Sequence, residues 1–159
     1  MKLSQWNERT AAKLEKLAGN GEIVACNTAD GVVFSDKAGT WCKYIAGSHL
    51  LAACWNREIF ADALRRHWKH AMEADAALAD SKQAGTVGGL KCCKFSARDF
   101  TMEVFVYEKI LRQFPKNTMF YLEGTNKPVI AGIWEAGQLH IIGLVMPFHL
   151  QGREFVPAA

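Results

Sequence analysis

The residues of this sequence best suited to chemistry are its thiols, because a thiolate can ligate a metal or attack a substrate. Five cysteines are present, odd in number and irregularly spaced: Cys26, Cys42, Cys54, Cys92 and Cys93. A zinc site needs ligands paired at short spacing, such as Cys-x-x-Cys, and no such pair occurs. The neighbours Cys92 and Cys93 point to opposite faces of an expected strand and cannot easily share one metal. We therefore expect reduced core thiols, no metal site and no cofactor.

Other catalytic signatures are also missing from the sequence. The glycine-rich stretch 85–89 lacks the Gly-Lys-Ser/Thr ending of a phosphate-binding loop. Neither a nucleophile elbow nor a paired-carboxylate pattern occurs. His67 and His70 are three residues apart, but a partnerless pair of this kind is more typical of surface histidines than of metal ligands. We expect a protein that is not an enzyme and has no catalytic residues, while a site assembled from distant residues stays open.

Lysine and arginine side chains form three groups on expected helices. The first group is Arg9, Lys13 and Lys16, the second is Arg65, Arg66 and Lys69, and the third is Lys109 and Arg112. Such side chains can contact the phosphates of DNA without reading its sequence. The alternative is a set of solubilising faces, since the net charge is only +3.

The hydrophobic patterning predicts an α+β protein in which helices hold these basic groups. Apolar residues at three- and four-residue spacing predict helices over residues 3–18, 48–80 and 99–114. Alternating or β-rich runs predict strands over residues 22–27, 32–34, 40–46, 90–96, 118–123, 129–134 and 138–145. Residues 82–89 are small and polar with three glycines, and we expect them to form a loop or hinge.

Length and composition are typical of one globular domain. The chain has 159 residues, of which 50% are hydrophobic and 22% charged, enough for one sizeable core. We therefore expect a single domain over residues 1–159. No signal-peptide core follows Met1, and the longest apolar stretch, 139–148, is too short to cross a bilayer as a helix. These features predict a cytoplasmic protein with no membrane partner.

Three short motifs stand in the second half of the sequence. They are Phe95-Ser96-Ala97-Arg98, the strand–turn–strand stretch 120–130, and the run from Gly137 to Pro147. A helix followed by a β-meander is expected twice along the chain, and the motifs belong to its second half. This layout resembles one domain of the bacterial DNA polymerase sliding clamp, chiefly the C-terminal domain of that processivity factor. The resemblance implies two helix-plus-antiparallel-sheet halves, with residues 48–83 as a long helical insertion and 151–159 as a C-terminal tail.

The resemblance also implies binding to macromolecules. Clamp helices touch duplex phosphates through lysine and arginine, and the three basic groups are the candidates for that role here. Clamps hold partner peptides in an apolar pocket near the last strand, and the corresponding positions are Val145, Met146, Pro147 and Phe148. The alternative is that these four residues cap the core. A clamp ring needs several such domains and this chain carries one, so an oligomer stays open.

Two hypotheses follow for the function. The first is a non-enzymatic, DNA-associated protein that contacts the duplex backbone, replication partners or both. The second is an accessory protein of a phage or plasmid, a mobile element, that acts as an inhibitor or modulator of a host replication or defence protein. DNA binding would weaken steeply with salt, whereas a protein partner would be recovered after nuclease treatment.

Overall fold

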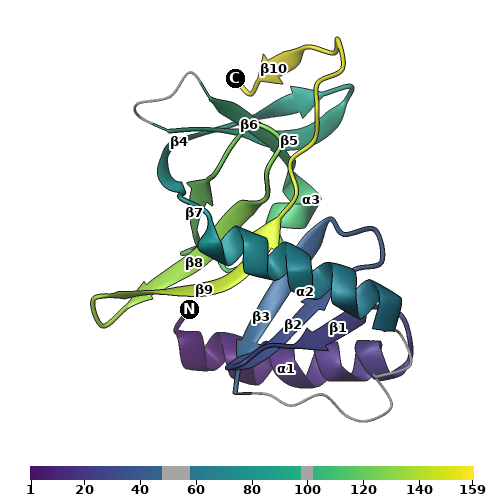
Figure 1. The fold of residues 1–159 in the computed structure, drawn as a ribbon. Coiled ribbons are helices and arrows are strands. Elements are labelled where there is room, and N and C mark those ends of the chain that lie inside the picture. The colour runs from purple at the N-terminus through teal and green to yellow at the C-terminus, as the bar shows by residue number, and fades with distance from the viewer. Residues whose placement is uncertain (48–57, 98–101) are drawn as a thin grey trace.

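A long antiparallel sheet is the central feature of the computed structural model, which describes residues 1–47, 58–97 and 102–159 (Figure 1). The strands are β1 Val24–Asn27, β2 Gly31–Ser35, β3 Trp41–Ala46, β4 Ala77–Val87, β5 Leu90–Ala97, β6 Glu103–Tyr107, β7 Met119–Leu122, β8 Val129–Glu135, β9 Gln138–Val145 and β10 Phe155–Pro157. The helices are α1 Leu3–Gly19, α2 Glu58–Glu73 and α3 Glu108–Leu111. The strand order is β1-β2-β3-β9-β8-β7-β4-β5-β6, with β10 paired to β4. The protein is therefore of the α+β class.

Helices α1 and α2 cover opposite faces of strands β1 to β3 (Figure 1). Successive residues of a strand point to opposite faces of the sheet. In β2, Val32 and Phe34 accordingly belong to the core that includes Leu14 of α1. Val33 belongs instead to a second core with Trp68 of α2. Every residue of β2 is buried, because the strand has a helix on each side.

The beginning of α1 is joined to the segment that follows α3. The ring of Trp6 stacks on the ring of Phe114, with centroids 5.7 Å apart. The side-chain amide of Asn117 donates to the backbone oxygen of Met1 at 2.8 Å. These contacts place α1 and residues 114–117 on the same side of the sheet.

Prediction from sequence succeeds for elements with strong local signals. The helix over 3–18 is confirmed as α1, and the strands over 22–27, 32–34, 40–46, 90–96, 118–123, 129–134 and 138–145 are confirmed as β1, β2, β3, β5, β7, β8 and β9. Gly21, just past the end of α1, has a φ of 78°, a conformation that glycine adopts at little cost. None of the described helices is long and apolar enough to cross a membrane.

The helix expected over residues 48–80, within the insertion 48–83, is wrong in its last part. Among the described residues α2 ends at Glu73, and the chain is strand from Ala77 onward. Most of the expected loop 82–89 belongs to the same strand, with only Gly88 and Gly89 forming the turn into β5. Strand β4 pairs with β5 on one side and with β7 and β10 on the other. Tertiary pairing therefore overrides its alanine-rich local pattern.

The helix expected over residues 99–114 is also wrong for most of its described part, residues 102–114. Residues 103–107 form strand β6, and α3 has only four residues. Val104 and Val106 pack into the core that α1 covers, and Phe105 lies against Phe155 with ring centroids 5.5 Å apart. A run that is apolar on both faces fits a helical spacing and a buried strand equally well. Of the two helices in the expected clamp-like layout, the second is therefore represented among the described residues only by the four residues of α3.

The expected C-terminal tail, residues 151–159, contains a strand. Its strand β10 pairs antiparallel with β4, from Phe155 opposite Val87 to Pro157 opposite Gly85. A Cβ atom on Gly85 would lie 2.5 Å from the ring of Phe155. Glycine at this position thus serves close packing of the ring and not the flexibility of a hinge.

Candidate functional site

The basic side chains of α1 lie in a row along one flank of the helix. Arg9, Lys13 and Lys16 are exposed and occur at positions i, i+4 and i+7, which places them one above another on a helix. Trp6 and Leu14 on the neighbouring stripe are buried against the sheet. The row therefore borders the contact between α1 and the sheet, as the sequence predicts.

Lys43 of β3 lies next to this row. Burial, and secondly the charge of Lys13, lower the pKa of Lys43 from 10.5 to about 8. Its Nζ donates to Oε1 of Gln113 at 2.9 Å and lies 4.6 Å from the centre of the Trp41 ring. Both partners are neutral, and no ion pair within the described residues joins Lys43 to an acid. Two ammonium groups are thus held near each other without a compensating carboxylate.

Lys109 and Arg112 belong to α3 and to the residue that follows it. Both are exposed, and Nη2 of Arg112 lies 2.9 Å from Oε1 of Glu108. The next residue, Gln113, is the partner of Lys43. The first and third basic groups therefore lie on one side of the sheet with Lys43 between them. We call this surface the basic face, and it consists of Arg9, Lys13, Lys16, Lys43, Lys109 and Arg112.

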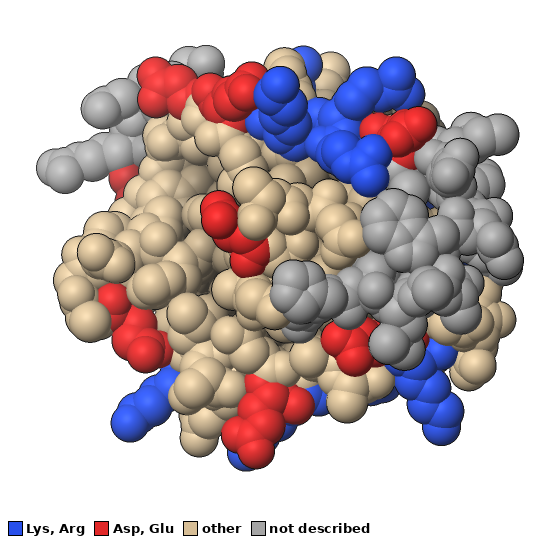
Figure 2. Space-filling model, turned by 60° about the horizontal axis from the view of Figure 1, so that its bottom comes forward, with Lys and Arg blue, Asp and Glu red and all other residues tan. Residues whose placement is uncertain are grey.

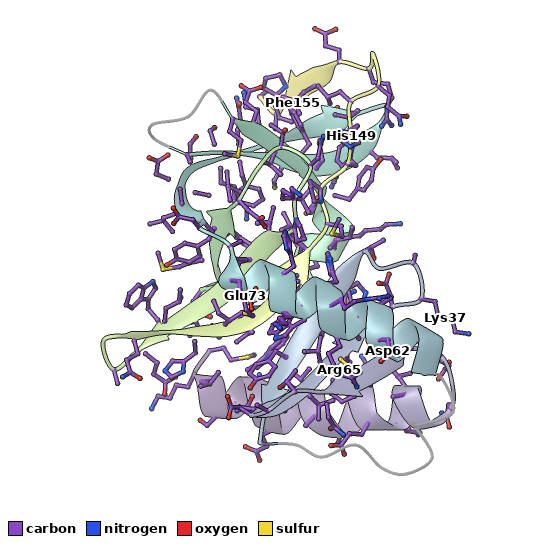
Figure 3. The ribbon with its side chains drawn as sticks, in the orientation of Figure 1. Lys37, Asp62, Arg65, Glu73, His149 and Phe155 are labelled. Atoms are coloured by element: carbon purple, nitrogen blue, oxygen red, sulfur yellow. The ribbon has the colours of Figure 1, made fainter. Side chains whose placement is uncertain are left out.

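The second basic group, Arg65, Arg66 and Lys69, lies elsewhere. It belongs to α2, which packs on the other face of β1 to β3, and Nη1 of Arg65 is 2.7 Å from Oδ1 of Asp62 (Figure 3). On the face shown in Figure 2, Lys and Arg side chains lie at two opposite edges, with Asp and Glu side chains among them. The structure brings two of the three predicted groups together and separates the third.

The four residues expected to hold a partner peptide do not line one pocket. Val145 is fully buried in the core. Met146 lines a cavity of about 240 Å³ beside α2. Phe148 stacks on Tyr107 with ring centroids 4.0 Å apart, while Pro147 is half-buried. Val145 and Phe148 have the packing contacts expected of residues that cap the core.

A cleft of about 780 Å³ adjoins the basic face, between the β4–β5 hairpin and the segment from α3 to β7. Arg112 belongs to both the cleft and the basic face. Three further cations that the sequence patterning does not single out also line the cleft: Lys82, Lys91 and Lys116. They come from separate segments, and the pairing of β4 with β5 places the first two on one face of the hairpin, with Lys91 opposite Thr86 and Lys82 opposite Phe95. Local sequence therefore carries no signal for this cluster.

Lys43 is also missed by the sequence analysis, although a signal for it exists. In β3 it lies two residues from both Trp41 and Ile45. Residues two apart in a strand share a face, so the side chain of Lys43 lies on the face of the sheet that α1 covers. A lysine among the inward positions of a predicted strand is unusual enough to mark it as a candidate. Its neighbour Gln113 comes from a distant segment, and no local pattern predicts that contact.

The described thiols are poor nucleophiles and poor metal ligands at neutral pH. Burial raises the pKa of Cys26 to about 11 and that of Cys42 to about 12, and it raises the pKa values of Cys92 and Cys93 as well. No group of histidine, cysteine and acidic residues suited to a metal occurs within the described ranges. Cys54 lies outside those ranges.

The two histidines considered as metal ligands lie near one acid. Burial lowers the pKa of His67, and Nε2 of His70 is 3.7 Å from Oε1 of Glu123. The contact of His70 with Glu123 is an ion pair only when the imidazole is protonated, and pairs with an exposed partner stabilise little.

Comparison of the chain with protein-family models, curated proteins and solved structures finds no match. The resemblance to sliding clamps therefore stays a prediction. Among the features formed by this chain's own residues, the basic face has the clearest chemistry.

Proposed function

We propose that this protein binds nucleic acid through its basic face, contacting the phosphates of a duplex without reading the base sequence. The observation that carries this proposal is the position of Lys43. Its ammonium group is partly buried beside Lys13, with neutral partners and a pKa of about 8. A phosphate placed here would supply the missing negative charge, and lysines that neutralise the phosphates of a duplex also release the counterions condensed on it.

The shape of the basic face favours a polymer of phosphates over a single small anion. Helix α1 has 17 residues, which corresponds to a length of about 25 Å at 1.5 Å per residue. The row from Arg9 to Lys16 spans seven residues of this helix, or about 10 Å, and the contact of Lys43 with Gln113 brings the residue next to Arg112 to the same region. An extended row of cations matches the repeated charges of a nucleic-acid backbone.

Charge reversal on the basic face provides the first test of this proposal. The variant Lys13→Glu/Lys16→Glu should bind a fluorescein-labelled 20-base-pair duplex about tenfold or more weakly in fluorescence anisotropy at low salt. The wild-type affinity should also fall linearly with salt on a double-logarithmic plot, with a slope of about −0.9 for each phosphate contacted. Because the variant loses two lysines, the magnitude of its slope should be smaller by about twice the value for one phosphate contact.

The second basic group offers a matched control. Arg66→Glu/Lys69→Glu changes the net charge by the same amount, on exposed residues of α2 at the other face of the sheet. We expect it to leave duplex affinity within about twofold at roughly 0.1 M salt, where the Debye length is about 10 Å and exposed charges farther apart are largely screened. Absence of wild-type binding at low salt, or equal losses in both double variants, would refute the proposal.

A second candidate function is binding of a protein partner, which a groove between α1, α2 and β9 favours. The groove has a volume of about 450 Å³ and is lined by Tyr44, Trp68 and Met72. Oδ1 of Asn7, which also lines it, is buried with no hydrogen-bond partner within the described residues. A partner would place an apolar side chain against Trp68 and a donor on Asn7. After nuclease treatment, the tagged wild type and the tagged Lys13→Glu/Lys16→Glu variant should both retain the protein partner. A tagged Met72→Asp variant should not retain it.

A further inference from the structure

A smaller pocket adjoins the basic face, between the start of β5 and α3. It has a volume of about 380 Å³, within the range typical of small-molecule sites. Two of its lining residues, Lys109 and Arg112, belong to the basic face as well, so the pocket continues that surface. We call it the terminal pocket, and its lining residues are Leu90, Lys91, Tyr107, Glu108, Lys109 and Arg112.

The apolar wall of the terminal pocket is accessible to a ligand. Leu90 is 56% exposed, and Tyr107 is half-buried. Cys92, two residues after Leu90, lies opposite Tyr107, which puts Leu90 and Tyr107 on the same face of the β5–β6 pair. A leucine beside a tyrosine ring gives an apolar surface on which a flat ring packs favourably.

The ring of Tyr107 is held in place by a neighbouring ring. It stacks on Phe148 with ring centroids 4.0 Å apart and an angle of 9° between the ring planes. The backbone N–H of Phe148 donates to the backbone oxygen of Phe105 at 2.9 Å. Phe148 is not among the described residues that line the terminal pocket, so the pocket meets a part of Tyr107 that Phe148 leaves uncovered. A ring fixed in this way loses little conformational entropy when a ligand stacks on it.

The rim of the terminal pocket is positively charged. Its cations Lys91, Lys109 and Arg112 are exposed. The carboxylate of Glu108 already pairs with Arg112 at 2.9 Å, and neither lysine has an ion pair within the described residues. Cations beside an accessible ring are the combination by which many proteins bind single-stranded nucleic acid, since the ring stacks on a base and the cations attract the phosphates.

We propose that the terminal pocket binds one unpaired base of a single-stranded overhang, whose phosphates lie near Lys91 and Lys109. The inference deepens the proposed function and rests on it for the placing of the duplex, which would lie on the basic face. A duplex backbone alone would leave Leu90 and Tyr107 uncovered. An acidic peptide also carries negative charge, but the continuity of the pocket with a row of cations favours a polymer of phosphates.

Overhangs with and without bases test the proposal. Fluorescence anisotropy would compare a blunt 20-base-pair duplex with the same duplex carrying a four-thymidine overhang, at the 3′ end or the 5′ end. We expect one overhang or both to raise the affinity about fivefold or more, because a base stacks on Tyr107. An overhang of four abasic units keeps the phosphates and lacks the bases, so its affinity should lie within about twofold of the blunt duplex.

Variants of the apolar wall locate the effect in the pocket. Leu90→Ser and Tyr107→Leu should each reduce the gain from the overhang to about twofold or less, and both should bind the blunt duplex as the wild type does. Leu78→Ser is the matched control, since Leu78 is 41% exposed and lies outside the terminal pocket. It should keep the full gain. Leu90→Ser decides the test if Tyr107→Leu proves unstable, because Leu90 is largely in solvent.

Failure of the pocket and failure of the proposed function give different results. Binding of the blunt duplex with no gain from either overhang would overturn the pocket alone. If the blunt duplex does not bind, the proposed function fails, and a ten-thymidine single strand tests the pocket. Binding of that strand that Leu90→Ser weakens supports the pocket, and no binding overturns it. Equal gains with abasic overhangs, equal losses in Leu90→Ser and Leu78→Ser, or equal displacement by an acidic pentapeptide with a central tyrosine would also overturn it.

Discussion

At the scale of single residues, the position of Lys43 is the least expected feature. Lysine side chains are seldom buried without a carboxylate, yet here the ammonium group is held by Gln113 and by the face of Trp41. Burial opposes its charge, and the nearby Lys13 opposes it further. The free protein therefore carries an electrostatic cost at Lys43 that a bound anion would relieve.

Replacing Lys43 by Met should stabilise the protein at neutral pH. The pKa of Lys43 is about 8 in the folded protein and 10.5 without burial. The unfolded chain therefore binds more protons between these values, and wild-type stability rises with pH across this window. We expect Lys43→Met to exceed wild type by about 1 kcal/mol at pH 7, after discounting for solvent screening, and to lose this advantage by pH 10.5.

Urea unfolding at pH 7, 9 and 10 measures that difference. Lys37→Met is the control, since Lys37 is exposed and its removal should leave stability within about 0.5 kcal/mol at every pH. A Lys43→Met advantage that stays constant with pH would show that packing, and not charge, explains it.

The buried thiols have the opposite pH dependence. The pKa of Cys42 is raised from 9.0 to about 12, and that of Cys26 to about 11, both chiefly by burial. Above pH 9 the unfolded chain loses these protons while the folded protein keeps them, so stability falls as pH rises. The loss should reach about 1.4 kcal/mol per pH unit for each thiol. In Cys26→Ala/Cys42→Ala the slope of unfolding free energy against pH, between pH 9 and 11, should be shallower than in wild type; an unchanged slope would contradict the assignment.

At the scale of elements, the accuracy of sequence-based prediction follows from where each element gets its structure. Helix α1 and strands β1 to β3 have a clear period and clear turn residues, and they are predicted correctly. Strand β4 has neither, because its alanines and polar residues become a strand only between β5, β7 and β10. Strand β6 is apolar on both faces, so its spacing could not exclude a helix.

Strand β10 should stabilise the sheet mainly through one ring. Phe155 is half-buried against Phe105 and covers Gly85, and in Figure 3 it lies at the end of the molecule away from Asp62. We expect Phe155→Ala to lower the free energy of unfolding by about 1–2 kcal/mol. Val156→Ala, at a neighbouring position that is 54% exposed, should cost less than about 0.5 kcal/mol in the same chemical denaturation experiment. Equal losses would mean that strand pairing, and not the ring, dominates.

At the scale of the whole molecule, the candidate site is less predictable than its parts. The sequence identifies the cations of α1 and α3 as separate groups, but not their shared side of the sheet. That arrangement depends on contacts between distant segments, such as Lys43 with Gln113 and Trp6 with Phe114. The cleft and the terminal pocket are likewise products of tertiary structure. A charge pattern predicts what a surface can bind, and only the fold decides which charges share one surface.

Phe114 should be central to holding these segments together. It stacks on Trp6, and a Cβ atom on Gly143 of β9 would lie 2.5 Å from its ring. We expect Phe114→Ala to cost about 3–4 kcal/mol of unfolding free energy. Trp134→Ala is a fitting control, because Trp134 is an aromatic residue that is 50% exposed, and its loss should cost less than about 1 kcal/mol. Similar melting temperatures for the two variants would contradict this role.

The pairing of β3 with β9 has a consequence for biosynthesis. Trp41 of β3 lies opposite Val145 of β9. The ribosome therefore synthesises β9 roughly a hundred residues after β3, which takes about 5–20 seconds at ordinary translation rates. During that interval the edge of β3 offers unpaired backbone groups to any passing strand. In the nascent chain the edge of β3 therefore stays unpaired during this interval. We expect ribosome-associated chaperones to bind the chain at this stage.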